Sequence, residues 1–147
     1  MKNAEKLLCL IFFICAFEIA RGKEVILPEV SDVKKILVVV DNNLTRPVKT
    51  ITNLDQISEI VNFINQQRKG WDKPWYGIPV PSLALDLYNK DKFIGHFGIG
   101  TNFFEAQRNG DFWSKPATKQ QREHILKLIN LPNDLDARLP ARKAGKQ

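Results

Sequence analysis

The segment from Ser82 to Trp113 constrains the fold more than any other, because short runs of alternating apolar and polar residues are separated by turn residues. In an extended chain Leu83, Leu85 and Leu87 share one face, since successive side chains point to opposite sides. The next run, Phe93 to Ile99, alternates in the same way. A period of two residues is typical of half-buried β-strands, so the segment predicts an antiparallel sheet built around these two runs.

The register of the two runs follows from their apolar sets. A slip of one residue would expose the apolar side chains of one run to water, so Leu85 is expected opposite Phe97. The same register places Asp86 directly opposite His96 on the other face. It also predicts a three-residue connection, Lys90 to Lys92, between the strands.

A hairpin is expected at the end of the segment, because Asn-Gly is the strongest short signal for a tight turn between strands. The turn at Asn109-Gly110 places Arg108 opposite Asp111. One face of this hairpin then carries Phe103 and Phe112, and the other carries Phe104 and Trp113.

The remaining elements follow from periodicity and capping. Residues 34–41 and 47–52 read as strands rich in β-branched residues. Residues 53–67 read as an amphipathic helix capped by Asn53, with Gln56 in capping-box position, and a second helix begins at Thr118. The expected fold is therefore α+β: an antiparallel sheet of five to six strands with two helices on one face, in the order ββαβββ(β)α.

The first 22 residues have the layout of a secretory signal peptide. Lys2 and Lys6 precede an unbroken apolar run of 11 residues from Leu7 to Phe17, and Ala20 and Gly22 supply small residues before the expected cleavage site. The run is shorter than the roughly 20 apolar residues that span a bilayer. We therefore expect signal peptide 1–22, one α+β domain over 23–131 and a flexible basic tail over 132–147. The mature chain would be exported, periplasmic or secreted, without a transmembrane span.

Charge and cysteine content narrow the function classes. The signal segment holds three basic and two acidic residues, so the 22 basic and 16 acidic residues fall to 19 and 14 and the net charge from +6 to +5. Both cysteines, Cys9 and Cys15, leave with the signal peptide, which excludes disulfides and thiolate chemistry in the mature chain. A small exported domain without disulfides favours a bacterial envelope protein, and export disfavours nucleic-acid binding.

The loop from Trp71 to Pro81 carries Trp71, Trp75 and Tyr76 on a segment that its three prolines and glycine keep irregular. These aromatic side chains are open to two interpretations. They can form a lid over one end of the core, or an exposed surface that contacts a partner.

Catalytic candidates are few. Asp86, Tyr88 and His96 are expected on one face of the sheet and could form an acid–base group. An ordinary cross-strand pair of Asp86 and His96 is the simpler interpretation. The glycines at 95, 98 and 100 lie inside a strand run with no helix after them, so they do not predict a phosphate loop or another cofactor site. Two histidines on separate elements do not predict a metal site.

We therefore expect a small exported binding or inhibitor-type module, with a protein partner in the cell envelope, rather than an enzyme. Aromatic and arginine side chains commonly anchor protein interfaces, so the expected binding residues lie in the aromatic loop and the hairpin: Trp71, Trp75, Tyr76, Phe103, Arg108 and Phe112. The alternative is a small hydrolase that uses Asp86, Tyr88 and His96.

Overall fold

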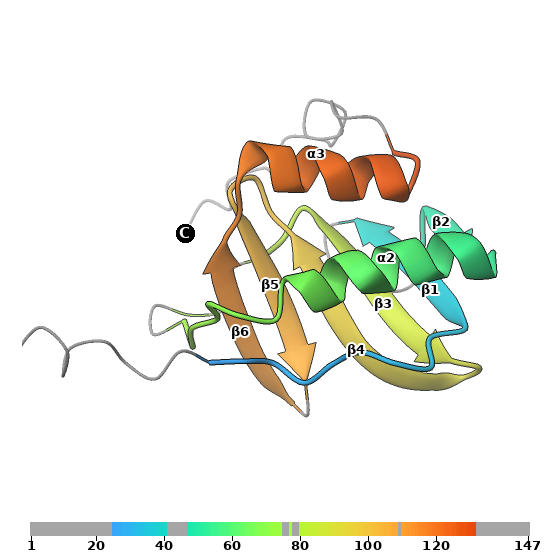
Figure 1. Ribbon diagram of the computed structural model, residues 1–147, viewed down its shortest axis with the longest axis horizontal. Helices are drawn as coiled ribbons and strands as arrows, with labels where there is room; N and C mark the ends of the chain where they lie inside the picture. Colours follow the sequence, from blue (N-terminus) through green and yellow to red (C-terminus); the bar gives the residue numbers. More distant parts are fainter. Residues whose placement is uncertain (1–24, 41–46, 75–76, 78–79, 109, 132–147) are drawn as a thin grey trace, which may run out of the picture.

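The computed structural model describes residues 25–40, 47–74, 77, 80–108 and 110–131, and the statements below concern these residues. They form an α+β fold with an antiparallel sheet in the strand order β2-β1-β3-β4-β5-β6 and two helices (Figure 1). This arrangement confirms the expected fold class, with the sixth strand present. The elements are β1 (Lys35–Val40), β2 (Lys49–Ile51), α2 (Leu54–Gln66), β3 (Leu83–Asn89), β4 (Lys92–Ile99), β5 (Phe103–Arg108), β6 (Asp111–Pro116) and α3 (Lys119–Leu128).

The two faces of the sheet differ. On the helix face, the strand side chains that pack beneath α2 are at most 1 % exposed: Leu83, Leu85, Leu87, Phe97, Ile99, Phe104 and Ala106. Phe63 of α2 meets Phe97 and Phe104 edge-on, with ring centroids 6.4 Å and 5.9 Å apart. The opposite side of the sheet is called the outer face below.

Helix α3 runs beside α2 and contributes Ile125, Leu126 and Ile129 to the same hydrophobic core (Figure 1). Its N-terminus has the expected capping box, in which Thr118 and Gln121 bond each other's backbone amides. The capping box expected at α2 is wrong in part. Asn53 accepts from the amide of Gln56 at 2.9 Å, but the Gln56 side chain donates to the Leu128 carbonyl at 2.7 Å. That bond links α2 to the C-terminal end of α3.

The predicted register of β3 and β4 is confirmed over Leu83–Leu87, with Leu85 opposite Phe97 and Asp86 opposite His96. The predicted three-residue connection is wrong. Asn89 pairs with Lys92 across a two-residue turn, and Lys90 adopts a φ of 54° in that turn.

A β-bulge reconciles the short turn with the register. The pairing shifts by one residue between Leu87 and Tyr88, so Ile94 is the extra residue on β4. The shift reverses the alternation at the start of β4. Ile94 packs against the core, while Phe93 is 45 % exposed and meets Tyr88 on the outer face, with ring centroids 5.6 Å apart.

The β5–β6 hairpin has the predicted register, with Arg108 opposite Asp111 and Ala106 opposite Trp113. Gly110 adopts a φ of 84°, which an L side chain rarely tolerates. As predicted, Phe104 and Trp113 share one face and Phe103 and Phe112 the other. The first pair lies on the helix face and the second on the outer face.

Candidate functional site

A row of paired residues crosses the outer face from one sheet edge to the other: Thr50, Leu37, Asp86, His96, Gln107 and Phe112. At its centre, Nδ1 of His96 and Oδ1 of Asp86 are 2.6 Å apart. The Asp86 and His96 side chains are only 3 % and 11 % exposed. In the tautomer that carries its proton on Nδ1, His96 donates this hydrogen bond to Asp86, and Nε2 is the acceptor nitrogen of the ring.

Glu105 lies in the next row, which joins Val39, Ala84, Gly98, Glu105 and Ser114. It is 2 % exposed. Burial raises the pKa of the Glu105 carboxyl above its usual range, and His96 opposes the change by lowering it. Within the described part of the chain, the carboxyl group has no hydrogen-bond or ion-pair partner.

Glu105 was not singled out from the sequence. The useful signal was the alternation of Phe103, Glu105 and Gln107 combined with the register of β4 and β5. Because Gly98 pairs with Glu105, His96 and Glu105 are diagonal neighbours on one face.

Gly98 and Gly100 allow close packing of other side chains against the backbone. A Cβ atom added to Gly98 would lie 2.7 Å from Cγ of Pro81 and 3.0 Å from Cβ of Glu105. Pro81 therefore covers the outer face at Gly98. A Cβ atom added at Gly100 would overlap the ring of Phe103.

Tyr88 lies on the same face as Asp86 and His96, two residues along β3 from Asp86. Its pKa is raised by burial and then by the charge of Asp86. Its ring packs against Phe93, and Lys35 Nζ lies 5.1 Å from the ring centroid. The three residues of the predicted acid–base group thus share one face, with Tyr88 turned towards the β3–β4 turn.

Trp71 occupies the position of a core lid. It is 2 % exposed, its Nε1 donates to the Gln67 carbonyl at 2.5 Å, and its ring meets Phe97 edge-on at 6.4 Å. A ring buried in this way cannot contact a partner in this conformation. Trp75 and Tyr76, which were expected to bind with it, lie outside the described residues.

The other three expected binding residues lie on the β5–β6 hairpin but on different faces. Phe103 and Phe112 are half-buried on the outer face, on either side of the Glu105–Ser114 pair. Arg108 is half-buried on the helix face, where its NH1 donates to the carbonyls of His96 at 3.2 Å and Gln107 at 2.9 Å.

A cavity of about 590 Å³, called the edge groove below, opens at the free side of β6. Asp72 lies against this side of β6 and exchanges two backbone hydrogen bonds with Ser114, each 2.9 Å long. Eight residues line the groove: Asp72, Lys73, Pro74, Asn102, Phe103, Ser114, Lys115 and Pro116. Three of these residues, Pro74, Phe103 and Pro116, are apolar and the other five are polar or charged, and a mixed lining of this kind can contact a protein or peptide ligand.

In the described ranges, no three histidine or carboxylate side chains gather closely enough to bind a metal ion. None of the helices described is both long and apolar enough to cross a bilayer. Comparison with protein-family models, curated proteins and solved structures finds no match to this chain.

Proposed function

We propose that this chain is a small exported binding or inhibitor-type module that contacts a protein partner through the edge groove and the outer face of the β5–β6 hairpin. The edge groove carries the proposal, because it places Phe103 in a 590 Å³ opening beside an edge strand. Edge strands are common contact sites for partner chains; because the backbone of Ser114 already bonds Asp72, a partner would contact this edge through the side chains of the groove. Phe112 extends the proposed contact surface along β6 towards the hairpin turn. At the other end of β6, Pro116 lacks a backbone amide donor.

Export is part of this proposal. Residues 1–22 would direct the chain to the periplasm or the medium, where an envelope protein is the expected partner. N-terminal sequencing of the exported protein should begin at Lys23. Retention of residues 1–22 in the cytoplasmic fraction would contradict export.

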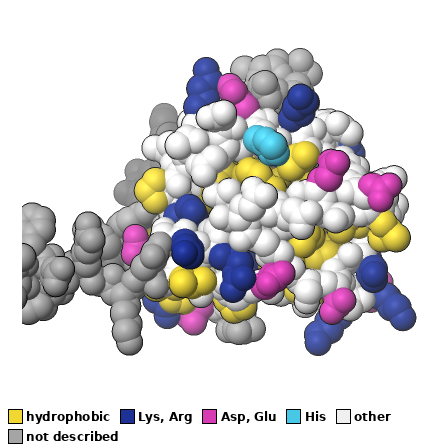
Figure 2. All heavy atoms as spheres, viewed as in Figure 1, with side chains coloured by type: hydrophobic (Ala, Val, Ile, Leu, Met, Phe, Trp, Pro, Cys, Tyr) yellow, Lys and Arg dark blue, Asp and Glu magenta, His cyan; other side chains and the backbone are white. Residues whose placement is uncertain are grey.

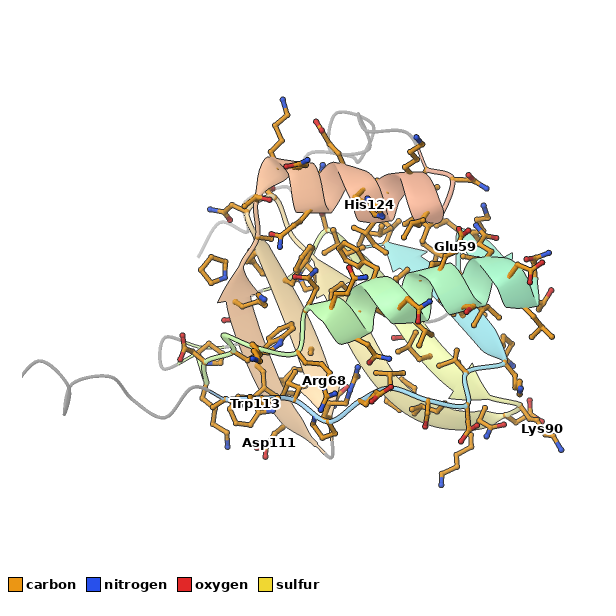
Figure 3. All side chains as sticks on the ribbon, in the orientation of Figure 1. Glu59, Arg68, Lys90, Asp111, Trp113 and His124 are labelled. Carbon is orange, nitrogen blue, oxygen red and sulfur yellow. The ribbon has the colours of Figure 1, made fainter. Side chains whose placement is uncertain are left out.

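Site-specific photo-crosslinking tests the contact surface. A benzoylphenylalanine residue at position 103 or 112 should crosslink one envelope protein, to be identified by mass spectrometry. Phe93 provides a matched control, because it is a 45 % exposed aromatic residue at the β3–β4 turn. Figure 3 places Lys90, in that turn, well away from Asp111 at the hairpin. Equal crosslinking from all three positions, or none from 103 and 112, would contradict the proposal.

The alternative function, a small hydrolase, is favoured by one observation: the 2.6 Å hydrogen bond between Asp86 and His96. Such a pair can orient a histidine as a general base. Ser114 is not positioned as its nucleophile, because it lies on β6, two strands away from His96.

The hydrolase alternative predicts that the protein cleaves an activated ester and that His96→Ala abolishes this activity. His124→Ala is the control, because His124 is exposed on α3. Equal rates for the two variants and the wild-type protein would eliminate the hydrolase.

A further inference from the structure

Basic side chains gather on the helix side of the β5–β6 hairpin. Figure 2 shows lysine and arginine side chains clustered between the C-terminal end of α2 and the lower part of β6. Arg68 and Arg108 line one cavity. Lys115 Nζ donates to the Lys69 carbonyl, and Lys73 and Lys115 line the edge groove. These five residues are called the basic cluster. Trp113 is its aromatic component, with Lys73 Nζ 5.2 Å from the ring centroid.

Arg108 is held rigidly but has no carboxylate partner among the described residues. Its guanidinium lies over Gly95, and its two bonds to backbone carbonyls both come from NH1. Nε and NH2 bond no acceptor in the described part of the chain. These two atoms form the edge of the fork that binds a carboxylate with two parallel hydrogen bonds.

Arg68 is a second arginine near Arg108. Both residues line one small cavity of about 10 Å³, together with Trp71 and Ala106. Nε of Arg68 donates to the Leu27 carbonyl at 2.8 Å, so this side chain is also fixed by the backbone. Its carboxylate partner is Glu29, at 3.5 Å, with side-chain exposures of 37 % for Arg68 and 66 % for Glu29. An ion pair so long and so exposed contributes little.

Two arginines line one cavity and together make one exposed ion pair, so positive charge at the half-buried Arg108 is left without a carboxylate among the described residues. An additional carboxylate at this position would gain charge-assisted hydrogen bonds from donors that are already oriented. Trp113 lies next to Ala106 across the hairpin, so an apolar platform adjoins the two arginines. Arg68, Trp113 and Asp111 appear together at this end of the molecule (Figure 3).

We propose that Arg108 and Arg68 form a carboxylate-binding subsite, and that the partner presents an acidic polypeptide segment to it. The inference rests on the proposed binding function and specifies the partner's chemistry. A polypeptide fits better than a polyanionic surface, because three acidic residues lie among the five basic ones: Glu29, Asp72 and Asp111. Lys73 is already paired with Asp111 at 3.0 Å. Of the two arginines, Arg108 keeps a donor edge without an acceptor in the described part of the chain, which suits a single carboxylate.

The test uses a fluorescein-labelled hexaglutamate peptide and the full mature chain at low salt, with anisotropy as the readout. Arg108→Gln should weaken binding about tenfold, as expected for the loss of a charge-assisted bidentate contact. Arg108→Lys should not restore it, because lysine lacks the planar fork. Lys92→Gln is the matched control for net charge, because Lys92 is exposed at the start of β4, and it should leave the affinity unchanged.

Glu29→Gln provides a test that misfolding cannot mimic. Removing the competing carboxylate should tighten hexaglutamate binding about two- to fivefold, in line with the strength of an exposed ion pair. Unchanged or weaker binding by Glu29→Gln, or equal weakening by Arg108→Gln and Lys92→Gln, would overturn the subsite.

Other anion sources are outcomes of the same experiment. If inorganic phosphate or vesicles with 30 % phosphatidylglycerol bind with dependence on Arg108 while hexaglutamate does not, the acidic-segment proposal is wrong. Crosslinking from positions 103 and 112 separates the two proposals. Crosslinking without hexaglutamate binding leaves the edge groove contact standing and rejects the subsite, whereas hexaglutamate binding without crosslinking rejects the edge groove contact alone.

Discussion

The carboxylate of Asp86 and the imidazole of His96 face each other across β3 and β4 at 2.6 Å, and both are buried on the face that α2 does not cover. A polar pair this well buried is costly to disrupt, because removal of one partner leaves the other desolvated and unpaired. The pair therefore contributes to stability whether or not it takes part in chemistry.

His96→Ala should lower the free energy of unfolding by about 3–5 kcal/mol, because it leaves the Asp86 carboxylate buried without its partner. Urea denaturation measures this change. Gln107→Ala is the control, since Gln107 is the half-buried neighbour of His96 in the same row. A loss for His96→Ala no larger than that for Gln107→Ala would contradict the importance of the pair.

Glu105 should make stability depend on pH. Because its pKa is higher in the folded protein than its usual value of 4.5, the folded state binds more protons than the unfolded state between these two values. The stabilisation of the folded state by the protonated Glu105 carboxyl is therefore fully present below pH 4.5. It is lost as the pH rises through the pKa of Glu105 in the folded protein.

Glu105→Gln should remove this dependence. The variant should be more stable than the wild-type protein at pH 7 and should differ little from it at pH 4. Urea midpoints across this pH range measure the difference, and a constant difference at every pH would contradict the assignment.

Trp71 should behave as a core residue. Trp71→Ala should cost about 3–5 kcal/mol of unfolding free energy, because it leaves a large cavity beside Phe97. Leu54→Ala is the control, because Leu54 is 60 % exposed on α2 and its truncation should change stability by less than about 0.5 kcal/mol. Comparable effects of the two substitutions would contradict the core position of Trp71.

Gly98→Ala should destabilise the protein by about 1–3 kcal/mol, as overpacking does elsewhere. The added methyl group would lie 2.7 Å from Cγ of Pro81 and 3.0 Å from Cβ of Glu105. Gly110→Ala should also destabilise the protein, but through backbone strain and not through overpacking. A φ of 84° is strained for alanine, whereas no atom lies within 4 Å of the added Cβ. Thermal unfolding of both variants checks the two expectations, and a Gly98→Ala protein as stable as the wild type would contradict close packing by Pro81.

Periodicity and capping predicted the strands, the helices and most of the register. Alternation fixed Asp86 opposite His96, because burial of the leucine face allows only one pairing. It failed at the start of β4, where the two-residue turn and the bulge at Ile94 exchange the faces of Phe93 and Ile94. A bulge depends on tertiary packing on both faces, which periodicity does not report.

The site was less predictable than the fold. The position of Trp71 depends on a bridge to Val25, and that of Asp72 on a bridge to Ser114, both of which join distant parts of the sequence. Glu105 required the register of β4 and β5, which the turn between them does not specify by residue type. Arg108 was selected for its chemistry, but the shared cavity with Arg68 depends on where α2 ends over the sheet.

Binding of the crosslinked partner is the most direct test of the central claim. Its dissociation constant should be measured against the wild-type chain, the Phe103→Ala/Phe112→Ala double variant and Phe93→Ala, with unfolding monitored in parallel. The double variant should bind at least about tenfold more weakly while still unfolding cooperatively, as expected for interface anchors, and Phe93→Ala should bind like the wild type. Unchanged affinity in the double variant, or an equal loss in Phe93→Ala, would contradict recognition through the edge groove and the hairpin.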